Sequence, residues 1–160
     1  DRYRAEELKD SRCRSSGRGG CPYREWNEKI AQLRDKPKAE QVREINRWAN
    51  TWTYVTDLAN WGIADYWATP GEFFARSGDC EDYAIVKFIS LRALGFDNDQ
   101  LRIVGVEDLN LQVGHSITLV ELDGQVQLLD NQIKGVVRAE TVHHYKPVYA
   151  VNEDAWWLYP

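Results

Sequence analysis

The segment GDCEDYAIVKFISLRALG, residues 78–95, decides the fold of this chain. Asp79 begins an apolar helix, and Gly95 is typical of the residue that ends one. The apolar residues of this helix cover much of its circumference and are Ala84, Ile85, Phe88, Ile89, Leu91 and Leu94. A helix that is apolar on most sides is predicted to lie in the core, so the rest of the chain has to cover it.

Helices are also predicted on the N-terminal side of this segment. Apolar residues recur at helical spacing in residues 26–33 and again, after Pro37, in residues 42–52. The sequence Thr-Pro-Gly-Glu at 69–72 favours the start of a short helix, because it supplies a capping threonine, a proline suited to the first turn and a glutamate that can reach back to the cap. Residues 54–67 have no clean period, so irregular backbone packed by aromatic rings is expected there.

Strands are predicted after the apolar helix. Four stretches are rich in branched side chains, namely residues 101–106, 116–122, 125–129 and 148–151. Asp123 and Gly124 separate two of these stretches and are typical of a two-residue hairpin turn. A run of helices followed by an antiparallel sheet indicates the α+β class.

The composition bounds the number of domains and the classes of function. A chain of 160 residues has the size of one domain, and 43% hydrophobic with 28% charged residues is ordinary for a globular protein. The chain has no run of about 18 apolar residues, which argues against an integral membrane protein. Its net charge of -5 argues against nonspecific binding to nucleic acid.

Charge and polarity differ along the chain. Residues 1–48 hold thirteen Lys and Arg against nine Asp and Glu, whereas residues 49–160 hold seven against sixteen, so a site in the second part lies in an acidic environment. Residues 1–22 are rich in Arg, Ser and Gly and have few large apolar side chains, which predicts a flexible N-terminal arm. Residues 23–160 are predicted to form the single folded domain.

The three cysteines cannot all pair within one chain. Cys13 and Cys21 flank a short polar stretch, where a small-loop disulfide is sterically feasible in an oxidising compartment, and the sequence leaves their redox state open. Cys80 differs because it falls in the first turn of the apolar helix. Unpaired backbone amides and the helix dipole stabilise a thiolate there, although a cysteine in a helix is more often a small buried hydrophobe.

His115 and Asp130 are predicted to lie near each other at one end of the hairpin. Pairing outward from the Asp-Gly turn brings His115 to within a residue or two of facing Asp130. Taken singly, His115 has the features of an exposed histidine and Asp130 those of a turn residue. Together with Cys80 they supply a nucleophile, a general base and acid, and an orienting carboxylate, which is the set that a cysteine hydrolase needs.

Three acidic residues, Asp79, Glu81 and Asp82, surround Cys80. Their charges oppose ionisation of the thiol, so alone they work against catalysis. Helix capping explains one or two of them, whereas a bound Ca²⁺ explains all three, because carboxylates are its preferred ligands and its charge reverses the effect on the thiol. The sequence therefore predicts a Ca²⁺ site beside Cys80, completed by oxygens from residues 50–65. A zinc site built on the cysteine, histidine and aspartate named above is the weaker alternative, because their spacing lacks a ligand pair.

The same residues carry a resemblance to a known family. The motifs are Asp-Cys-Glu-Asp at 79–82, Leu-Arg-Ala-Leu-Gly at 91–95, Val-Gly-His-Ser at 113–116 and Leu-Asp-Asn-Gln at 129–132. With the Trp-rich segment before the cysteine, they make residues 23–152 similar to the bacterial transglutaminase-like cysteine proteinases. The resemblance implies a papain- or transglutaminase-like core, in which N-terminal helices pack on an antiparallel sheet with the catalytic cysteine at a helix start. It gives the catalytic roles to Cys80, His115 and Asp130.

The resemblance also implies a specific function. It implies a periplasmic, calcium-dependent endopeptidase that cuts the N-terminal region of a large surface adhesin, at a site with paired alanines, and so releases biofilm cells. The implied partner is the periplasmic domain of an inner-membrane cyclic-di-GMP receptor, which sequesters the protease as an inhibitor. The resemblance implies neither a nucleic-acid partner nor a membrane-integral segment, and it does not extend to residues 1–22.

Two other functions remain open on the residues alone. The same machinery can pass an acyl group to an amine, as a transglutaminase-like acyltransferase does. Seven tryptophans are also typical of a noncatalytic module that binds a peptide or a protein through a Trp-rich face. For the oxyanion, the backbone amide of Cys80 is the expected first donor, and the indole N–H of Trp61 or Trp67 is a weaker candidate for the second.

Overall fold

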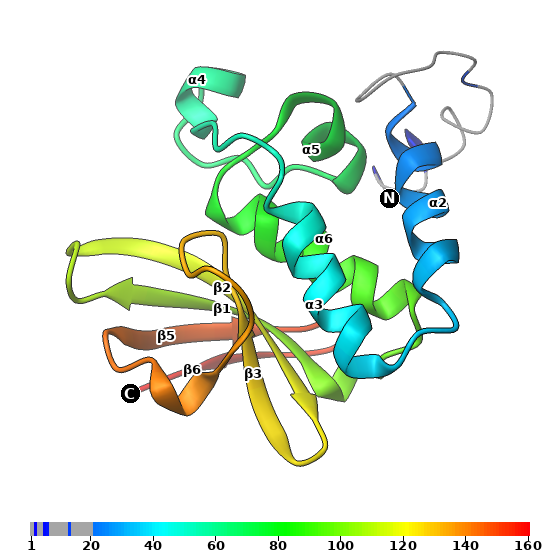
Figure 1. Ribbon diagram of the computed structural model, residues 1–160. Helices are drawn as coiled ribbons and strands as arrows, with labels where there is room; N and C mark the ends of the chain where they lie inside the picture. The colour runs from blue at the N-terminus through cyan, green and yellow to red at the C-terminus, as the bar shows by residue number, and fades with distance from the viewer. Residues whose placement is uncertain (1, 3–4, 7–12, 14–20) are drawn as a thin grey trace.

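A computed structural model of the chain describes residues 2, 5–6, 13 and 21–160 (Figure 1). Most of the predicted N-terminal arm, residues 1–22, lies outside the described residues, so its flexibility stays a prediction. Cys13 and Cys21 form a disulfide, which is one of the two states that the sequence left open. Helix α2 (Pro22–Leu33) begins directly after Cys21.

The N-terminal half of the chain folds into helices. Their bounds are α2 Pro22–Leu33, α3 Lys38–Ala49, α4 Asp57–Trp61, α5 Pro70–Arg76 and α6 Cys80–Ala93. The two predicted amphipathic helices are α2 and α3, and each buries one face in the core. The predicted capping box of α5 is present, because the Glu72 backbone N–H donates to the Thr69 hydroxyl and the Thr69 backbone N–H donates to the Glu72 carboxylate at 2.8 Å.

The C-terminal half forms one antiparallel sheet with the strand order β4-β3-β2-β1-β5-β6. The strands are β1 Leu101–Asp108, β2 Val113–Leu122, β3 Gln125–Leu129, β4 Val137–Arg138, β5 Tyr145–Val151 and β6 Trp156–Leu158, with short 3-10 helices η1 Asn98–Gln100 and η2 Ala139–Thr141. The four predicted strands correspond to β1, β2, β3 and β5. The predicted α+β class is confirmed.

The turn between β2 and β3 sets the register that positions the candidate site. The backbone angle φ is +53° at Asp123 and +74° at Gly124, so both turn residues are left-handed. Such a turn matches the twist of the two strands, and it is the turn that the Asp-Gly pair predicts. Pairing runs outward from it to Thr118 opposite Leu129, so β3 ends one residue before Asp130.

Helix α6 lies behind α3 in Figure 1 and packs on α3 and on the sheet. Leu91 is fully buried, and the Thr118 hydroxyl of β2 donates to the Ala84 carbonyl at 2.9 Å, so the helix is fixed directly on the strand. Ile85 and Ile89 are only partly buried. The prediction that this helix lies in the core is confirmed.

Several tryptophans belong to the core and not to a binding face. Trp26 and Trp52 are buried, and Trp48 packs against Trp52 with 4.9 Å between ring centroids. The indole N–H of Trp52 also donates to the Phe74 carbonyl at 3.0 Å. The tryptophan content therefore gives less support to a Trp-rich binding module than the sequence alone suggests.

Five short elements lie outside the sequence prediction, namely α4, β4, β6 and the 3-10 helices η1 and η2. None exceeds five residues, which is too short for an apolar period to be recognised. Strand β6 places Trp156 and Trp157 on the edge of the sheet beside β5. None of the helices that the structure describes has the length and apolar content that crossing a membrane requires.

Candidate active site

Cys80 is the first residue of α6, and the residues before it fix its position. Ser77 ends α5 with a left-handed φ of +65°. Gly78 lies so close to Asp82 that a Cβ atom at this position would lie 2.1 Å from the carboxylate of Asp82. Asp79 is the N-cap, and its backbone N–H donates to Asp82 at 3.3 Å. The local sequence thus holds the start of α6 against one carboxylate.

His115 and Asp130 form a buried hydrogen-bonded pair, as the hairpin register predicts. The distance from His115 Nε2 to Asp130 Oδ1 is 2.7 Å. Asp130 also accepts from the Tyr145 hydroxyl at 2.7 Å and from the Gln132 backbone N–H at 3.1 Å. Burial acts to raise the pKa of Asp130, but the hydrogen bond and charge of His115 outweigh it, so this pKa lies below its usual value. The carboxylate is therefore ionised at neutral pH and orients the imidazole.

Cys80 and His115 line the same cavity of about 330 Å³. The backbone N–H of Ser116, the neighbour of His115 on β2, acts to lower the pKa of the Cys80 thiol. Because Asp130 occupies Nε2 of His115, Nδ1 is the nitrogen left for proton transfer, and it lies 3.3 Å from the Gln132 side-chain amide. The structure thus brings the three predicted residues to one site.

The Cys80 thiol is protonated in the absence of a cation. Burial and the neighbouring carboxylates of Glu81 and Asp79 raise the pKa of Cys80 to about 12, and the thiol donates to Glu81 at 3.2 Å. The favourable position at the start of α6 does not offset these two effects. An active thiolate at this position therefore needs a positive charge close by.

A cluster of carboxylates lies beside Cys80 and includes the three predicted acids. Side-chain oxygens of Asp57, Asp79 and Asp82 lie within 4.8 Å of one another, as do those of Asp57, Asp65 and Glu81. Asp57 and Asp65 were not named individually by the sequence, although both fall in the segment 50–65 that was expected to complete a cation site. Asp57 and Asp82 are almost completely buried.

The cluster is electrostatically incomplete without a cation. One oxygen of Asp57 and one of Asp79 are buried and have no hydrogen-bond partner among the described residues. Burial, with the neighbouring negative charges, raises the pKa of both Asp79 and Asp82 to about 7. A hard divalent cation would pair with the free oxygens and remove the repulsion, so the donor set fits Ca²⁺. Asp82 contributes less, because its oxygens already accept from the backbone N–H groups of Ala68 and Asp79.

The weaker alternatives for this region receive little support. Among the described residues, no group of three close metal-ligating side chains contains His115 or Asp130, so the zinc alternative lacks a ligand set. The Trp67 indole lies at the cavity of Cys80, but its N–H donates to Asp65 at 3.0 Å. Trp61 lines a different cavity, beside α5. The second oxyanion donor therefore remains unassigned.

Lys87 is a buried charge near the site that the sequence analysis missed. It lies in the middle of the apolar helix α6, where nothing in the local pattern marks it, and it is 1% exposed. Its ammonium lies 5.7 Å from the centroid of the Tyr83 ring and is attracted by Asp130. Burial lowers the pKa of Lys87 to about 7, and the Asp130 charge only partly opposes this shift.

The burial of Lys87 predicts a rise in stability with pH. Between pH 7 and the ordinary lysine pKa of 10.5, the unfolded chain binds more protons at Lys87 than the folded protein does, so stability increases across this window and is lost as the pH falls to 7. The slope is at most about 1.4 kcal/mol per pH unit. Urea unfolding of the wild type and of Lys87→Met at pH 7, 8 and 9 measures it.

We expect the Lys87→Met substitution to remove this pH-dependent component. The matched control is Lys146→Met, which changes an exposed lysine of β5. A Lys87→Met protein that kept the slope of the wild type would show that Lys87 is not held in a neutral form by burial.

The chain is similar in sequence and in structure to known cysteine proteinases. The sequence profile of the family described as bacterial transglutaminase-like cysteine proteinase matches residues 12–159. Calcium-bound LapG of Legionella pneumophila has 30% sequence identity and a TM-score of 0.82, over 98% of this chain and 87% of the LapG chain. No curated protein sequence matches the chain.

Two further structures of the same Legionella pneumophila protein agree with the first. LapG shares 31% identity and a TM-score of 0.81, over 97% of this chain and 86% of its own. EGTA-treated LapG has 31% identity and a TM-score of 0.82, over 98% of this chain and 84% of the LapG chain. The predicted arrangement of helices on an antiparallel sheet, in a transglutaminase-like fold, is confirmed by this similarity.

Proposed function

Because this chain belongs to the bacterial transglutaminase-like cysteine proteinase family, we propose that it is a calcium-dependent endopeptidase whose catalytic residues are Cys80, His115 and Asp130. The observation that carries the assignment of residues is the His115–Asp130 hydrogen bond of 2.7 Å, at a cavity that Cys80 shares with His115. A nucleophile, a base and an orienting carboxylate at one cavity supply what acyl transfer through a thiol requires.

The geometry supports a two-step hydrolysis. The Cys80 sulfur attacks the scissile carbonyl carbon, and the backbone N–H of Cys80 is the proposed donor to the oxygen that becomes negative. His115 carries the thiol proton to the leaving amine, and the C–N bond breaks to leave a thioester. His115 then takes a proton from water as the water oxygen attacks the thioester carbonyl carbon. The C–S bond breaks, the acyl group leaves as a carboxylic acid, and His115 returns the proton to the Cys80 sulfur. Asp130 keeps Nδ1 of the imidazole directed to this task.

Calcium is the proposed cation of the carboxylate cluster. Asp57, Asp65, Asp79 and Glu81 would hold it with their side-chain oxygens, and Asp82 would support the site through the backbone. When bound, Ca²⁺ supplies a positive charge that favours the thiolate of Cys80. The calcium-bound and EGTA-treated forms of the Legionella pneumophila relative support this assignment.

The proposed substrate is a large surface adhesin, cut in its N-terminal region at a site with paired alanines to release biofilm cells. We place the enzyme in the periplasm, under control of a cyclic-di-GMP receptor whose periplasmic domain sequesters it. The family membership supports both proposals. The Cys13–Cys21 disulfide supports an oxidising compartment.

Product analysis tests hydrolysis against the two alternatives. We expect the calcium-loaded protein, mixed with the N-terminal region of such an adhesin and a fluorescent amine, to yield two fragments and no labelled product. Mass spectrometry of the products identifies the new termini. Labelled amine in the product would instead indicate an acyltransferase, and binding without fragments or label would indicate the noncatalytic module.

A further inference from the structure

A second cavity lies between α3 and the segment 131–136, on the chain between β3 and β4. Its volume is about 590 Å³, which is within the range of ligand-binding pockets. Neither Cys80 nor His115 lines it. The cavity is therefore separate from the one in which the proposed chemistry takes place.

Three amide side chains in the walls of this cavity have an oxygen without a partner among the described residues. Asn46 and Asn50 come from α3, and Asn131 comes from the facing segment. The side-chain oxygen of each is buried and has no hydrogen-bond partner among the described residues, and Asn46 as a whole is only 1% exposed. A buried acceptor without a partner costs about 1–3 kcal/mol, so these walls favour a ligand that brings N–H or O–H groups.

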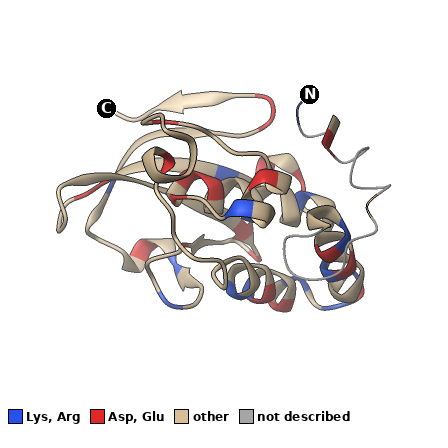
Figure 2. Ribbon diagram, turned by 90° about the horizontal axis from the view of Figure 1, so that it is seen from above, with Lys and Arg blue, Asp and Glu red and all other residues tan. Residues whose placement is uncertain are grey.

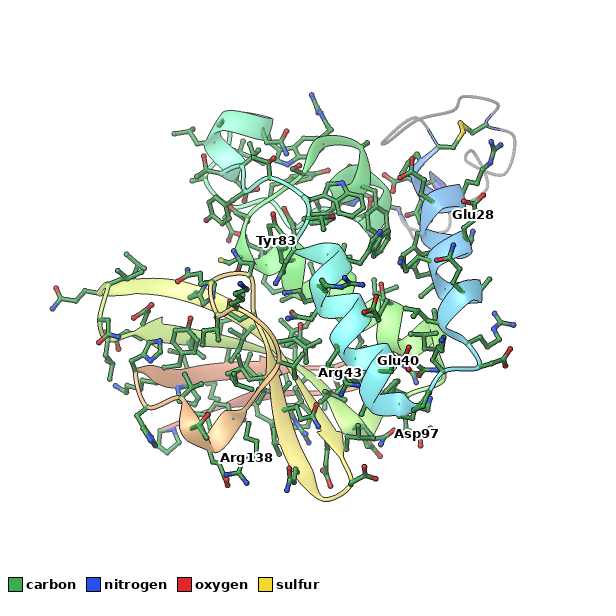
Figure 3. The ribbon with its side chains drawn as sticks, in the orientation of Figure 1. Glu28, Glu40, Arg43, Tyr83, Asp97 and Arg138 are labelled. Atoms are coloured by element: carbon green, nitrogen blue, oxygen red, sulfur yellow. A yellow bond between two sulfur atoms is a disulfide. The ribbon has the colours of Figure 1, made fainter. Side chains whose placement is uncertain are left out.

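The rim of the cavity is positively charged. Arg43 and Arg47 project from α3, where Figure 3 labels Arg43, and Lys134 lies on the opposite segment. Arg47 pairs with Glu44 at 2.6 Å, whereas no ion pair to Arg43 or Lys134 is formed within the described part of the chain. Figure 2 shows the basic positions of α3 among acidic ones of the same helix. The rim nevertheless carries an excess of positive charge in a protein whose net charge is -5.

We propose that this cavity binds an acidic peptide segment of the protein substrate. Its carboxylates would pair with Arg43 and Lys134 at the rim, and its backbone N–H groups would donate to the amide oxygens of the walls. A peptide of this kind satisfies both features of the cavity at once, whereas a simple anion brings no donors for the asparagines. The proposal deepens the proposed function, because it gives the endopeptidase a docking site away from the scissile bond.

Two hydrogen bonds connect this docking site to the catalytic residues. The Asn50 side chain donates to the Asp130 carbonyl at 2.7 Å. The side-chain amide of Gln132, which also lines the cavity, lies 3.3 Å from Nδ1 of His115. A substrate held in the docking site therefore has its next residues within reach of the cavity at Cys80.

Peptide binding to the calcium-loaded Cys80→Ala protein tests the proposal without catalysis. The probes are a fluorescein-labelled decapeptide with Asp and Glu at alternate positions, and the same peptide with Asn and Gln instead. We expect the acidic peptide to bind at least tenfold more tightly by fluorescence anisotropy, and the difference to shrink as salt is raised. Arg43→Glu with Lys134→Glu should abolish the preference. The control Arg34→Glu with Lys146→Glu makes the same change of net charge at exposed positions away from the cavity and should leave it intact.

Some outcomes would overturn the docking site, and a different one would overturn the proposed function. Equal affinity for the two peptides would show that the rim does not select acidic segments. The same conclusion would follow if the control variant lost the preference for the acidic peptide as fully as the Arg43 and Lys134 variant does. Competition by free aspartate as effective as that of the acidic peptide would show a site for small anions. Hydrolysis of a short peptide substrate is measured in parallel on the calcium-loaded protein that retains Cys80, where the Arg43 and Lys134 changes should leave it unaltered. Binding without any hydrolysis would keep the docking site and reject the proposed function.

Discussion

The Cys80→Ala variant is expected to turn over a protein substrate at least about 10⁴-fold more slowly than the wild type, because it lacks the only atom that can form the thioester. His115→Ala should approach the same loss, because Glu81, the other cavity group that accepts from the thiol, is a proposed calcium ligand and would not be free to carry the proton when the ion is bound. Fragment yield against time, with calcium present, measures both. The fold should survive in each variant, and far-ultraviolet circular dichroism checks this.

Alkylation of Cys80 by iodoacetamide separates the role of His115 from simple loss of turnover. The wild type with calcium should react faster near pH 7 than a free thiol does, and His115→Ala should lose this advantage. His143→Ala is the matched control, because it removes an exposed histidine outside the site. Equal alkylation rates in His115→Ala and the wild type would show that the imidazole does not activate the thiol, and the proposed chemistry would then be wrong.

The parts of the fold that the sequence predicts are those with strong local signals. The apolar circumference of α6, the capping box of α5 and the Asp-Gly turn each depend on a few neighbouring residues, and all three are present. By contrast, β4 has two residues and β6 three, and each exists only because a longer neighbouring strand offers it hydrogen bonds. Pairing of that kind is a tertiary effect that a short window of sequence does not contain.

In the candidate site, too, the residues with local sequence signals are predicted and those brought in by tertiary contacts are not. The hairpin register, counted outward from a two-residue turn, is enough to bring His115 to Asp130. Asp57 and Asp65 approach Glu81 only through the path of the chain around α4, so the sequence indicates their segment and not the residues. Lys87 was missed for a different reason. A lysine in a helix is normally expected on a solvent-exposed face. Helix α6 is instead covered by the sheet and α3, and Lys87 is buried.

Removal of calcium is expected to lower turnover by at least about 100-fold. With a pKa of about 12, the Cys80 thiol is ionised in only about one molecule in 10⁵ at pH 7, and a cation among the carboxylates reverses this effect. EGTA in excess should abolish fragment production, and added Ca²⁺ should restore it. Isothermal titration of the EGTA-treated, dialysed protein with Ca²⁺ measures the binding directly.

The Asp79→Asn variant distinguishes a cation site from helix capping by the sign of its effect. Asparagine caps a helix as well as aspartate does, so the start of α6 should be preserved. If the acids served only as caps, removal of the Asp79 charge would lower the pKa of Cys80 and speed its alkylation. If they hold Ca²⁺, the variant should need at least about tenfold more calcium for half-maximal activity, because one carboxylate ligand is lost. Asp99→Asn, an exposed change in η1, is the control. Faster alkylation of Asp79→Asn together with unchanged calcium dependence would therefore assign the carboxylates to capping and remove the cation from the mechanism.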